Sequence, residues 1–142
     1  MKTKKKKVLC IERNSSLAFV LKTVFKNAFD ITVVANALQA IEVLRIQSDT
    51  DFIIISVEKN NYRNLALIDH LRSSTFLKNI PLIILAESIT EELEDLKKDP
   101  QVINVLEKPF DPIQLVNVVE KQCYRPNETE IIFKKRKLLN LN

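Results

Sequence analysis

Residues 51–60 read DFIIISVEKN, and the apolar part of this stretch decides the fold class. Five of the six residues from Phe52 to Val57 are apolar, and three of them are consecutive isoleucines. Such a run is typical of a strand that is buried on both faces. Ser56 places one hydroxyl near its end. The question is whether Ser56 is a nucleophile or fills a position that once held another residue.

Short apolar runs alternate with amphipathic segments on both sides of this strand. We expect strands at residues 7–12, 31–35, 52–57, 81–86 and 102–106, and helices at 15–29, 36–47, 64–74, 90–99 and 111–123. Five consecutive strand–helix units predict a parallel sheet with helices on both faces. The common arrangement is a flavodoxin-like, doubly wound (βα)5 α/β fold with strand order 2-1-3-4-5.

Apolar residues recur at helical spacing in the first three expected helices. The stripes are Leu17, Leu21, Val24 and Ala28 in the first, Leu38, Ile41 and Leu44 in the second, and Leu65, Ile68 and Leu71 in the third. Thr90 is the expected N-cap of the fourth helix. Asp111 followed by Pro112 is a strong start signal for the fifth.

Length and composition indicate one globular domain. The chain has 142 residues, 46% of them hydrophobic and 28% charged, and no apolar run reaches the length of a membrane span. Because the N-terminus also lacks the apolar segment of a signal peptide, we expect a cytoplasmic protein. Cys10 and Cys123 lack metal-ligand spacing, and His70 is the only histidine. We therefore expect no metal and no cofactor, with Cys10 in a strand core, Cys123 at a helix end and His70 exposed.

The net charge of +4 is concentrated at the two ends of the chain. Residues 1–7 carry five lysines, and residues 124–142 carry five basic and two acidic residues, which leaves −4 for residues 8–123. A mildly acidic body argues against a nucleic-acid-binding face on the folded domain. Contact with nucleic acid or an anionic membrane is expected only through the tails, if at all.

The predicted topology also indicates where ligands bind. In this strand order, binding sites lie beyond the carboxyl ends of the first and third strands, where the order reverses. Glu12 and Arg13 follow the first strand, and Ser56 ends the third. These three residues are therefore the first candidates for a functional site.

Four segments resemble, in order and spacing, the receiver domain of two-component response regulators. They are KVLCIERN, DFIIISV, IPLIILAES and VLEKPFDPIQL, and the resemblance covers residues 6–123. It implies a CheY-like receiver. Such receivers accept a phosphoryl group on an aspartate that ends the third strand, and they hold Mg²⁺ with that aspartate and an acidic pair after the first strand. A Ser or Thr after the fourth strand and a lysine after the fifth complete the site.

Most of that site is changed in this chain. The phosphoacceptor position is Ser56, the acidic pair is Glu12 and Arg13, and the hydroxyl position is Ala86. Only the lysine remains, as Lys108.

Three further positions are carried over from the resemblance. The switch aromatic of the fifth strand becomes Val105, and Asn64 lies near the position of a family glycine. The resemblance also implies a cis peptide before Pro109.

These changes predict a degenerate phosphorylation pocket. A serine needs a neighbouring base to act as a nucleophile, and Glu12 is the only nearby carboxylate that we can name. Mg²⁺ prefers carboxylate oxygens, whereas Arg13 repels it. We expect Ser56 to bond nearby backbone and Glu12 to pair with Lys108. Arg13 either occupies the vacant metal position or points to solvent.

The leading functional hypothesis is a pseudo-receiver that is not an enzyme and binds a protein partner without being phosphorylated. The partner is a signalling protein or a second copy of this chain. We expect it to bind the surface that residues 90–99, 102–106 and 111–123 form. One alternative is a phosphorelay receiver with Ser56 or Glu58 as acceptor, and another is a tail-driven nucleic-acid or membrane binder. Only 19 residues follow Cys123, so we expect output to act through a partner.

Residues 124–142 form a basic C-terminal tail outside the resemblance. Pro126 is expected to break the preceding helix. Asn127 and Glu130 indicate the start of a short amphipathic helix that docks on the body or on a partner. If the tail is extended instead, Ile131 and Phe133 face one way and can add an edge strand.

Overall fold

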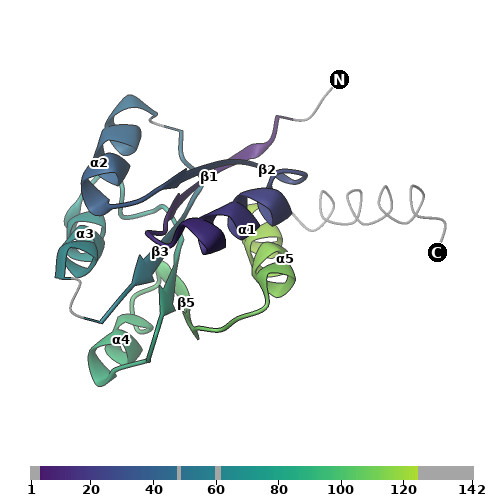
Figure 1. Ribbon diagram of the computed structural model, residues 1–142. Helices are drawn as coiled ribbons and strands as arrows, with labels where there is room; N and C mark the ends of the chain where they lie inside the picture. Colours follow the sequence, from purple (N-terminus) through teal and green to yellow (C-terminus); the bar gives the residue numbers. More distant parts are fainter. Residues whose placement is uncertain (1–3, 48, 60–61, 125–142) are drawn as a thin grey trace.

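The computed structural model describes residues 4–47, 49–59 and 62–124, in which five strands alternate with five helices (Figure 1). The strands are β1 (Lys6–Ile11), β2 (Phe29–Val34), β3 (Phe52–Val57), β4 (Leu82–Ala86) and β5 (Val102–Glu107). The helices are α1 (Ser15–Phe25), α2 (Ala37–Ile46), α3 (Tyr62–Ser73), α4 (Glu91–Leu96) and α5 (Pro112–Cys123).

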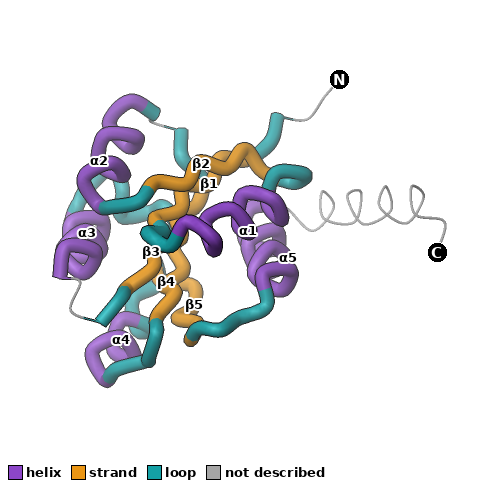
Figure 2. Tube along the Cα trace, in the orientation of Figure 1, coloured by secondary structure: helices purple, strands orange, loops and turns teal. Residues whose placement is uncertain are grey.

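The strands form one parallel sheet in the order β2-β1-β3-β4-β5, which confirms the predicted topology. In the middle of the sheet, Ile54 of β3 lies between Cys10 of β1 and Ile83 of β4. Figure 2 shows the sheet as the central layer, with α1 and α5 on one side and α2, α3 and α4 on the other. The carboxyl ends of β1, β3 and β5 therefore share one edge of the sheet.

The all-apolar character of β3 follows from its position between two cores. All six of its residues are buried. Phe52 and Ile54 pack in the core beneath α1 and α5, whereas Ile53, Ile55 and Val57 pack in the core beneath α2, α3 and α4. Because successive side chains of a strand point to opposite faces, a strand covered on both sides needs apolar residues throughout.

Short polar residues begin four of the helices. Asn14 Oδ1 accepts a hydrogen bond from the Leu17 amide at 2.9 Å at the start of α1, and Asn36 caps α2 in the same way. Thr90 caps α4, and Asp111 followed by Pro112 begins α5, so both predicted start signals are confirmed. With no glycine in the chain, these residues supply the turn and cap geometry.

The first helix is shorter than its sequence pattern predicted. It ends at Phe25, and Phe29, which was expected to be its last residue, begins β2. Phe25 and Phe29 are both buried in the core beneath α1 and α5, with ring centroids 5.6 Å apart. The turn at residues 26–28 ends the helix and lets Phe29 enter β2, while both rings stay in the same core.

The apolar stripe predicted for α2 is largely wrong. Leu38 is 72% exposed and Ile41 40%, whereas Ala37, Ala40 and Leu44 face the core. The two alanines lie where α2 packs against the core residues of the sheet. Small side chains there let the helix lie close to the strands, and this leaves the larger Leu38 and Ile41 at the surface.

The expectations for the two cysteines and the histidine are met. Cys10 is buried in β1, Cys123 is a half-buried free thiol at the end of α5, and His70 is exposed on α3. Within the described ranges, no helix is both long enough and apolar enough to cross a membrane. The predictions for the tail concern residues 125–142 and lie outside the described residues, except that Tyr124 is buried in the domain.

Candidate functional site

Three side chains from distant parts of the sequence meet at the carboxyl edge of the sheet. Ser56 of β3 donates a hydrogen bond from Oγ to Glu12 Oε1 at 2.5 Å. Lys108, which follows β5, donates from Nζ to the same oxygen at 2.9 Å. The predicted ion pair between Glu12 and Lys108 is therefore confirmed.

The Glu12 carboxylate is buried, and each of its oxygens has a partner. Its side chain is 0% exposed, whereas that of Lys108 is 20% exposed. The second oxygen, Oε2, accepts a hydrogen bond from the Asn14 amide at 2.9 Å. A buried carboxylate needs a counter-charge and hydrogen bonds, and here the ammonium, the hydroxyl and the amide supply them.

The hydrogen-bond partner of Ser56 differs from the expected one. We expected its hydroxyl to bond nearby backbone, but it bonds the Glu12 carboxylate. The neighbouring backbone carbonyls are largely engaged in the parallel ladders on both sides of β3. The carboxylate is also the stronger acceptor, because it carries a charge. The backbone carbonyl of Ser56 accepts a bond from Asn64 Nδ2 at 2.6 Å.

Sequence reasoning did not give Asn14 and Asn64 these roles. Asn14 both caps α1 and supplies the amide that bonds Glu12, and Asn64 of α3 is buried against the end of β3. A helix-cap signal was available at Asn14, since a short polar residue precedes the apolar stripe of α1. Nothing comparable marks Asn64, because its role depends on where α3 packs.

Arg13 turns away from the buried carboxylate. Its side chain is 75% exposed, and it pairs with Glu58, with Nη1 3.9 Å from Oε2. Of the two alternatives for Arg13, the solvent-facing one agrees with this geometry. An arginine that is mostly in water does not fill the interior position that a metal would occupy.

The other residues carried over from the resemblance are part of the same edge. Ala86 is fully buried, and its carbonyl accepts a bond from the Lys108 amide at 2.8 Å, so it holds the lysine backbone but offers no hydroxyl. Val105 is buried in β5 beside Ile84. The peptide between Lys108 and Pro109 is cis, as predicted.

Cys10 lies beneath the site in β1. Burial raises the pKa of its thiol, the nearby Glu12 charge raises it further, and Lys108 has a smaller opposite effect. The thiol is therefore protonated at neutral pH and is not a reactive nucleophile.

The side chains of this site do not fit a Mg²⁺ ion. Mg²⁺ binds oxygen ligands, usually one or two carboxylates together with water and phosphate. Glu12 is already bonded to an ammonium group, and the neighbouring acidic position holds the cation Arg13. In the described part of the chain, no group of three or more His, Cys, Asp or Glu side chains is arranged to hold a metal ion.

Sequence comparison finds no relative, since no family model and no curated protein matches the chain. Structural comparison finds many. Chemotaxis protein CheY4 of Vibrio cholerae has a TM-score of 0.72 at 19% identity, and the match covers 83% of this chain and 98% of that one. The fold of this chain is CheY-like.

Two further structures extend the likeness. An orphan response regulator of H. pylori matches with a TM-score of 0.69 at 18% identity, over 87% of this chain and 100% of that one. A phosphorylated cyanobacterial phytochrome response regulator matches with a TM-score of 0.67 at 21% identity, over 84% of this chain and 94% of that one. At these identities the likeness concerns the fold, so the chemistry of the site has to be argued from the residues of this chain.

Proposed function

We propose that this chain is a pseudo-receiver, which acts in cytoplasmic signal transduction by binding a protein partner and is neither phosphorylated nor an enzyme. The observation that carries the proposal is the bonding of Ser56 and Lys108 to one oxygen of the buried Glu12 carboxylate. The hydroxyl, the carboxylate and the ammonium satisfy one another, and the Asn14 amide completes the set.

Phosphoryl transfer needs groups that this pocket lacks. A phosphoryl group carries negative charge, which receivers balance with a metal ion and a lysine. Here the ammonium of Lys108 already neutralises Glu12, and Arg13 lies largely in solvent. A phosphoryl group on Ser56 would add negative charge beside a buried carboxylate and compete with it for Lys108.

The α4–β5–α5 surface is our candidate for the partner interface. The first turn of α4 carries three acidic residues, and Glu91 and Glu92 among them are exposed. Glu94 pairs with Lys97 at 3.1 Å and Asp95 with Lys98 at 3.4 Å, so part of this charge is balanced locally. A partner with a basic patch suits the acidic start of α4, and self-association through the same surface is the second possibility.

One observation favours an altered phosphoacceptor as a second candidate function. Ser56 Oγ lies 2.5 Å from Glu12 Oε1, which is the geometry of a hydroxyl and a general base. Against it, the oxygen that would take the proton already bonds Lys108. Glu58, the other alternative acceptor, lies beside Arg13 and outside this network.

A phosphorylation assay on the intact protein tests both candidates. The protein is incubated with Mg²⁺ and either acetyl phosphate or beryllofluoride, and its mass and amide spectrum are recorded. We expect no added phosphoryl mass and no saturable shift of the Ser56 amide. A Mg²⁺-dependent, saturable change overturns the proposal, and its loss in Ser56→Ala assigns the acceptor to Ser56 rather than Glu58.

The interface is tested by charge reversal. The intact chain is used to capture partners from its own cells, and the Glu91→Lys/Glu92→Lys variant is compared with Glu42→Lys on α2. We expect the α4 variant alone to lose the captured protein. Capture that survives the α4 change but disappears at raised salt supports binding through the basic tails instead.

A further inference from the structure

Strand β2 is an edge strand of the sheet in the part of the chain that the structure describes. Within the described residues it pairs only with β1. The Val34 carbonyl accepts a bond from the Glu12 amide at 2.9 Å and therefore faces β1. Backbone groups alternate in direction along a strand, so those of Ile31 and Val33 face outward from the sheet. An uncovered edge of this length is a template for another strand.

The described chain ends beside the start of this edge. The Tyr124 hydroxyl donates to the Ala28 carbonyl at 2.7 Å and accepts a bond from the Lys6 amide at 3.4 Å. Its ring lies against Phe29, with centroids 5.6 Å apart. Tyr124 thus fixes the end of α5 next to the first residue of β2, and the residues that follow start from there.

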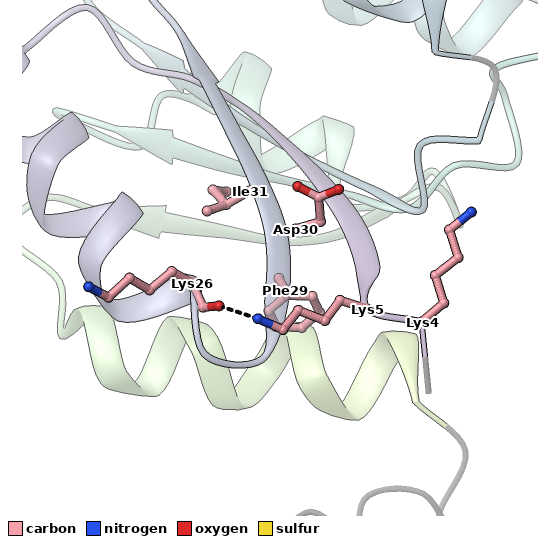
Figure 3. Close-up of a pocket in the computed structure, with 6 residues that line it drawn as sticks. All are labelled: Lys4, Lys5, Lys26, Phe29, Asp30 and Ile31. Atoms are coloured by element: carbon pink, nitrogen blue, oxygen red, sulfur yellow. Dashed lines mark hydrogen bonds between the residues drawn. The ribbon is translucent and has the colours of Figure 1, made fainter. Parts of the chain in front are cut away.

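A basic depression lies at the same place. It has a volume of about 500 Å³ and is lined by Lys4, Lys5, Lys26, Phe29, Asp30 and Ile31. Figure 3 shows Lys5 reaching across to the backbone of Lys26, whose carbonyl accepts its hydrogen bond at 2.9 Å. Three lysines and one aspartate line the depression, and the Lys4 ammonium also lies 3.8 Å from Asp49, so a smaller excess of positive charge remains there for an acidic segment.

We propose that residues 128–133 of the chain itself, ETEIIF, cover this depression and pair with the outer edge of β2 as a sixth, parallel strand. Glu128 lies four residues after Tyr124, which is a reach of at most about 14 Å. Glu128 and Glu130 are the only acidic residues after Glu120. Their negative charges complement the lysines that line the depression. The open edge thereby favours the extended alternative for this segment over the helical one.

The connection that this pairing requires has the correct hand. The step from β1 through α1 to β2 moves towards this edge on the α1 and α5 side of the sheet. A step from β5 through α5 to a strand beyond β2 moves in the same direction on the same side. Both crossovers therefore have the same hand, which is right-handed in nearly all parallel sheets.

The side chains of the segment also fit the faces of β2. Phe29, Ile31 and Val33 share the face covered by α1 and α5, and the last two are only partly buried. In a strand, Ile131 and Phe133 share one side, as the alternation of side chains requires, and can extend that core. The short connection to Tyr124 gives this segment a high effective concentration at β2, which favours it over a segment from a second copy.

Amide exchange of single residues in the full chain tests the proposal. We expect slow exchange at Ile31 and Val33 in the unmodified protein, and exchange at least tenfold faster at both in the Ile131→Asp variant. The Thr32 amide, which faces β1, should stay protected in both, and this shows that the domain remains folded. Leu141→Asp is the matched control, an equal change in the tail outside the segment, and it should leave all three amides unchanged.

Three results overturn the proposal. The first is fast exchange at Ile31 and Val33 in the unmodified chain, and the second is slow exchange that Ile131→Asp leaves unchanged. The third is protection that falls when the protein is diluted, because the covering segment then belongs to a second copy. Nuclear Overhauser contacts between residues 131–133 and residues 31–33, present at all concentrations, are the positive result.

Discussion

Glu12 and Lys108 form a buried ion pair across 96 residues of sequence, with 2.9 Å between Oε1 and Nζ. The glutamate side chain has no exposure, so it depends on this partner for its counter-charge. The pair joins the ends of β1 and β5, on either side of β3. It therefore has a structural role that is independent of any phosphoryl chemistry.

Removing the lysine should destabilise the domain. Breaking a buried ion pair typically costs about 3–5 kcal/mol, and the partial exposure of Lys108 should reduce this to about 2–3 kcal/mol for Lys108→Ala. Urea unfolding at neutral pH measures the change. Lys97→Ala, which breaks the more exposed pair with Glu94, is the control and should cost under about 1 kcal/mol.

Ser56→Ala should cost less than Lys108→Ala. It removes one hydrogen bond to the charged Glu12 carboxylate, worth about 1.5 kcal/mol at the lower end for a charged acceptor, but leaves the counter-charge in place. The same urea experiment ranks the two variants. If Ser56→Ala is the more damaging, the hydroxyl and not the lysine holds the carboxylate, and the electrostatic account of the pocket is wrong.

Restoring two acidic residues should restore metal binding. The double variant Arg13→Asp/Ser56→Asp places three carboxylates, with Glu12, at the ends of β1 and β3, and this is the oxygen-rich arrangement that Mg²⁺ requires. We expect a saturable Mg²⁺ titration of nearby amide signals in the double variant only. Saturable binding by the unmodified protein would show that the conclusion about Mg²⁺ is wrong.

Much of the fold was predictable because local signals and global packing agree. The apolar run of β3 required cover on both faces, and the strand–helix alternation left few topologies. The Glu12–Lys108 pair was also predictable, because the topology places Glu12 at the end of β1 and the resemblance to receivers places Lys108 in the same site. The tail prediction remains a prediction, since it concerns residues outside the described ranges.

The predictions for the buried face of α2 and for the hydrogen-bond partner of Ser56 were wrong. In both cases tertiary packing selects between local patterns that the sequence alone does not distinguish. In α2 the positions 37, 40 and 44, spaced by three and four residues, are as compatible with one helix face as 38, 41 and 44, spaced by three and three. Only the short distance between α2 and the sheet selects the face with the two alanines. The acceptor chosen by Ser56 depends on which neighbouring carbonyls the ladders already occupy. Neither the helix-to-sheet distance nor that occupancy is visible in a local stretch of sequence.

The corrected face of α2 gives a direct test. Ala40→Leu adds volume to a fully buried position and should destabilise the domain by about 1–3 kcal/mol. Leu38→Ser changes a side chain that is 72% exposed and should stay within about 0.5 kcal/mol of the unmodified protein. Thermal unfolding compares the two. The opposite ranking would mean that Leu38, and not Ala40, packs in the core.

The Asp99 carboxylate predicts a pH dependence of stability. The hydrogen bond from Arg72 Nε to Asp99 Oδ2, at 2.6 Å, lowers the pKa of this carboxyl, and the Gln101 amide bonded to Oδ1 lowers it further. A carboxyl with a lowered pKa in the folded state adds stability above its unfolded pKa of about 3.9. That stability is lost as the pH falls through the folded value.

Asp99→Asn isolates this contribution. The asparagine oxygen can still accept the bond from Gln101, but the charge that pairs with Arg72 is removed. Because the Arg72 side chain is 37% exposed, we expect a loss of only about 1 kcal/mol at pH 7. The difference should be constant down to about pH 5 and shrink as the pH falls below about 4, in urea unfolding series of both proteins. Asp95→Asn, in an exposed pair with Lys98, is the control and should cost less at every pH. A difference that grows on acidification would mean that the charged form of Asp99 does not stabilise the fold.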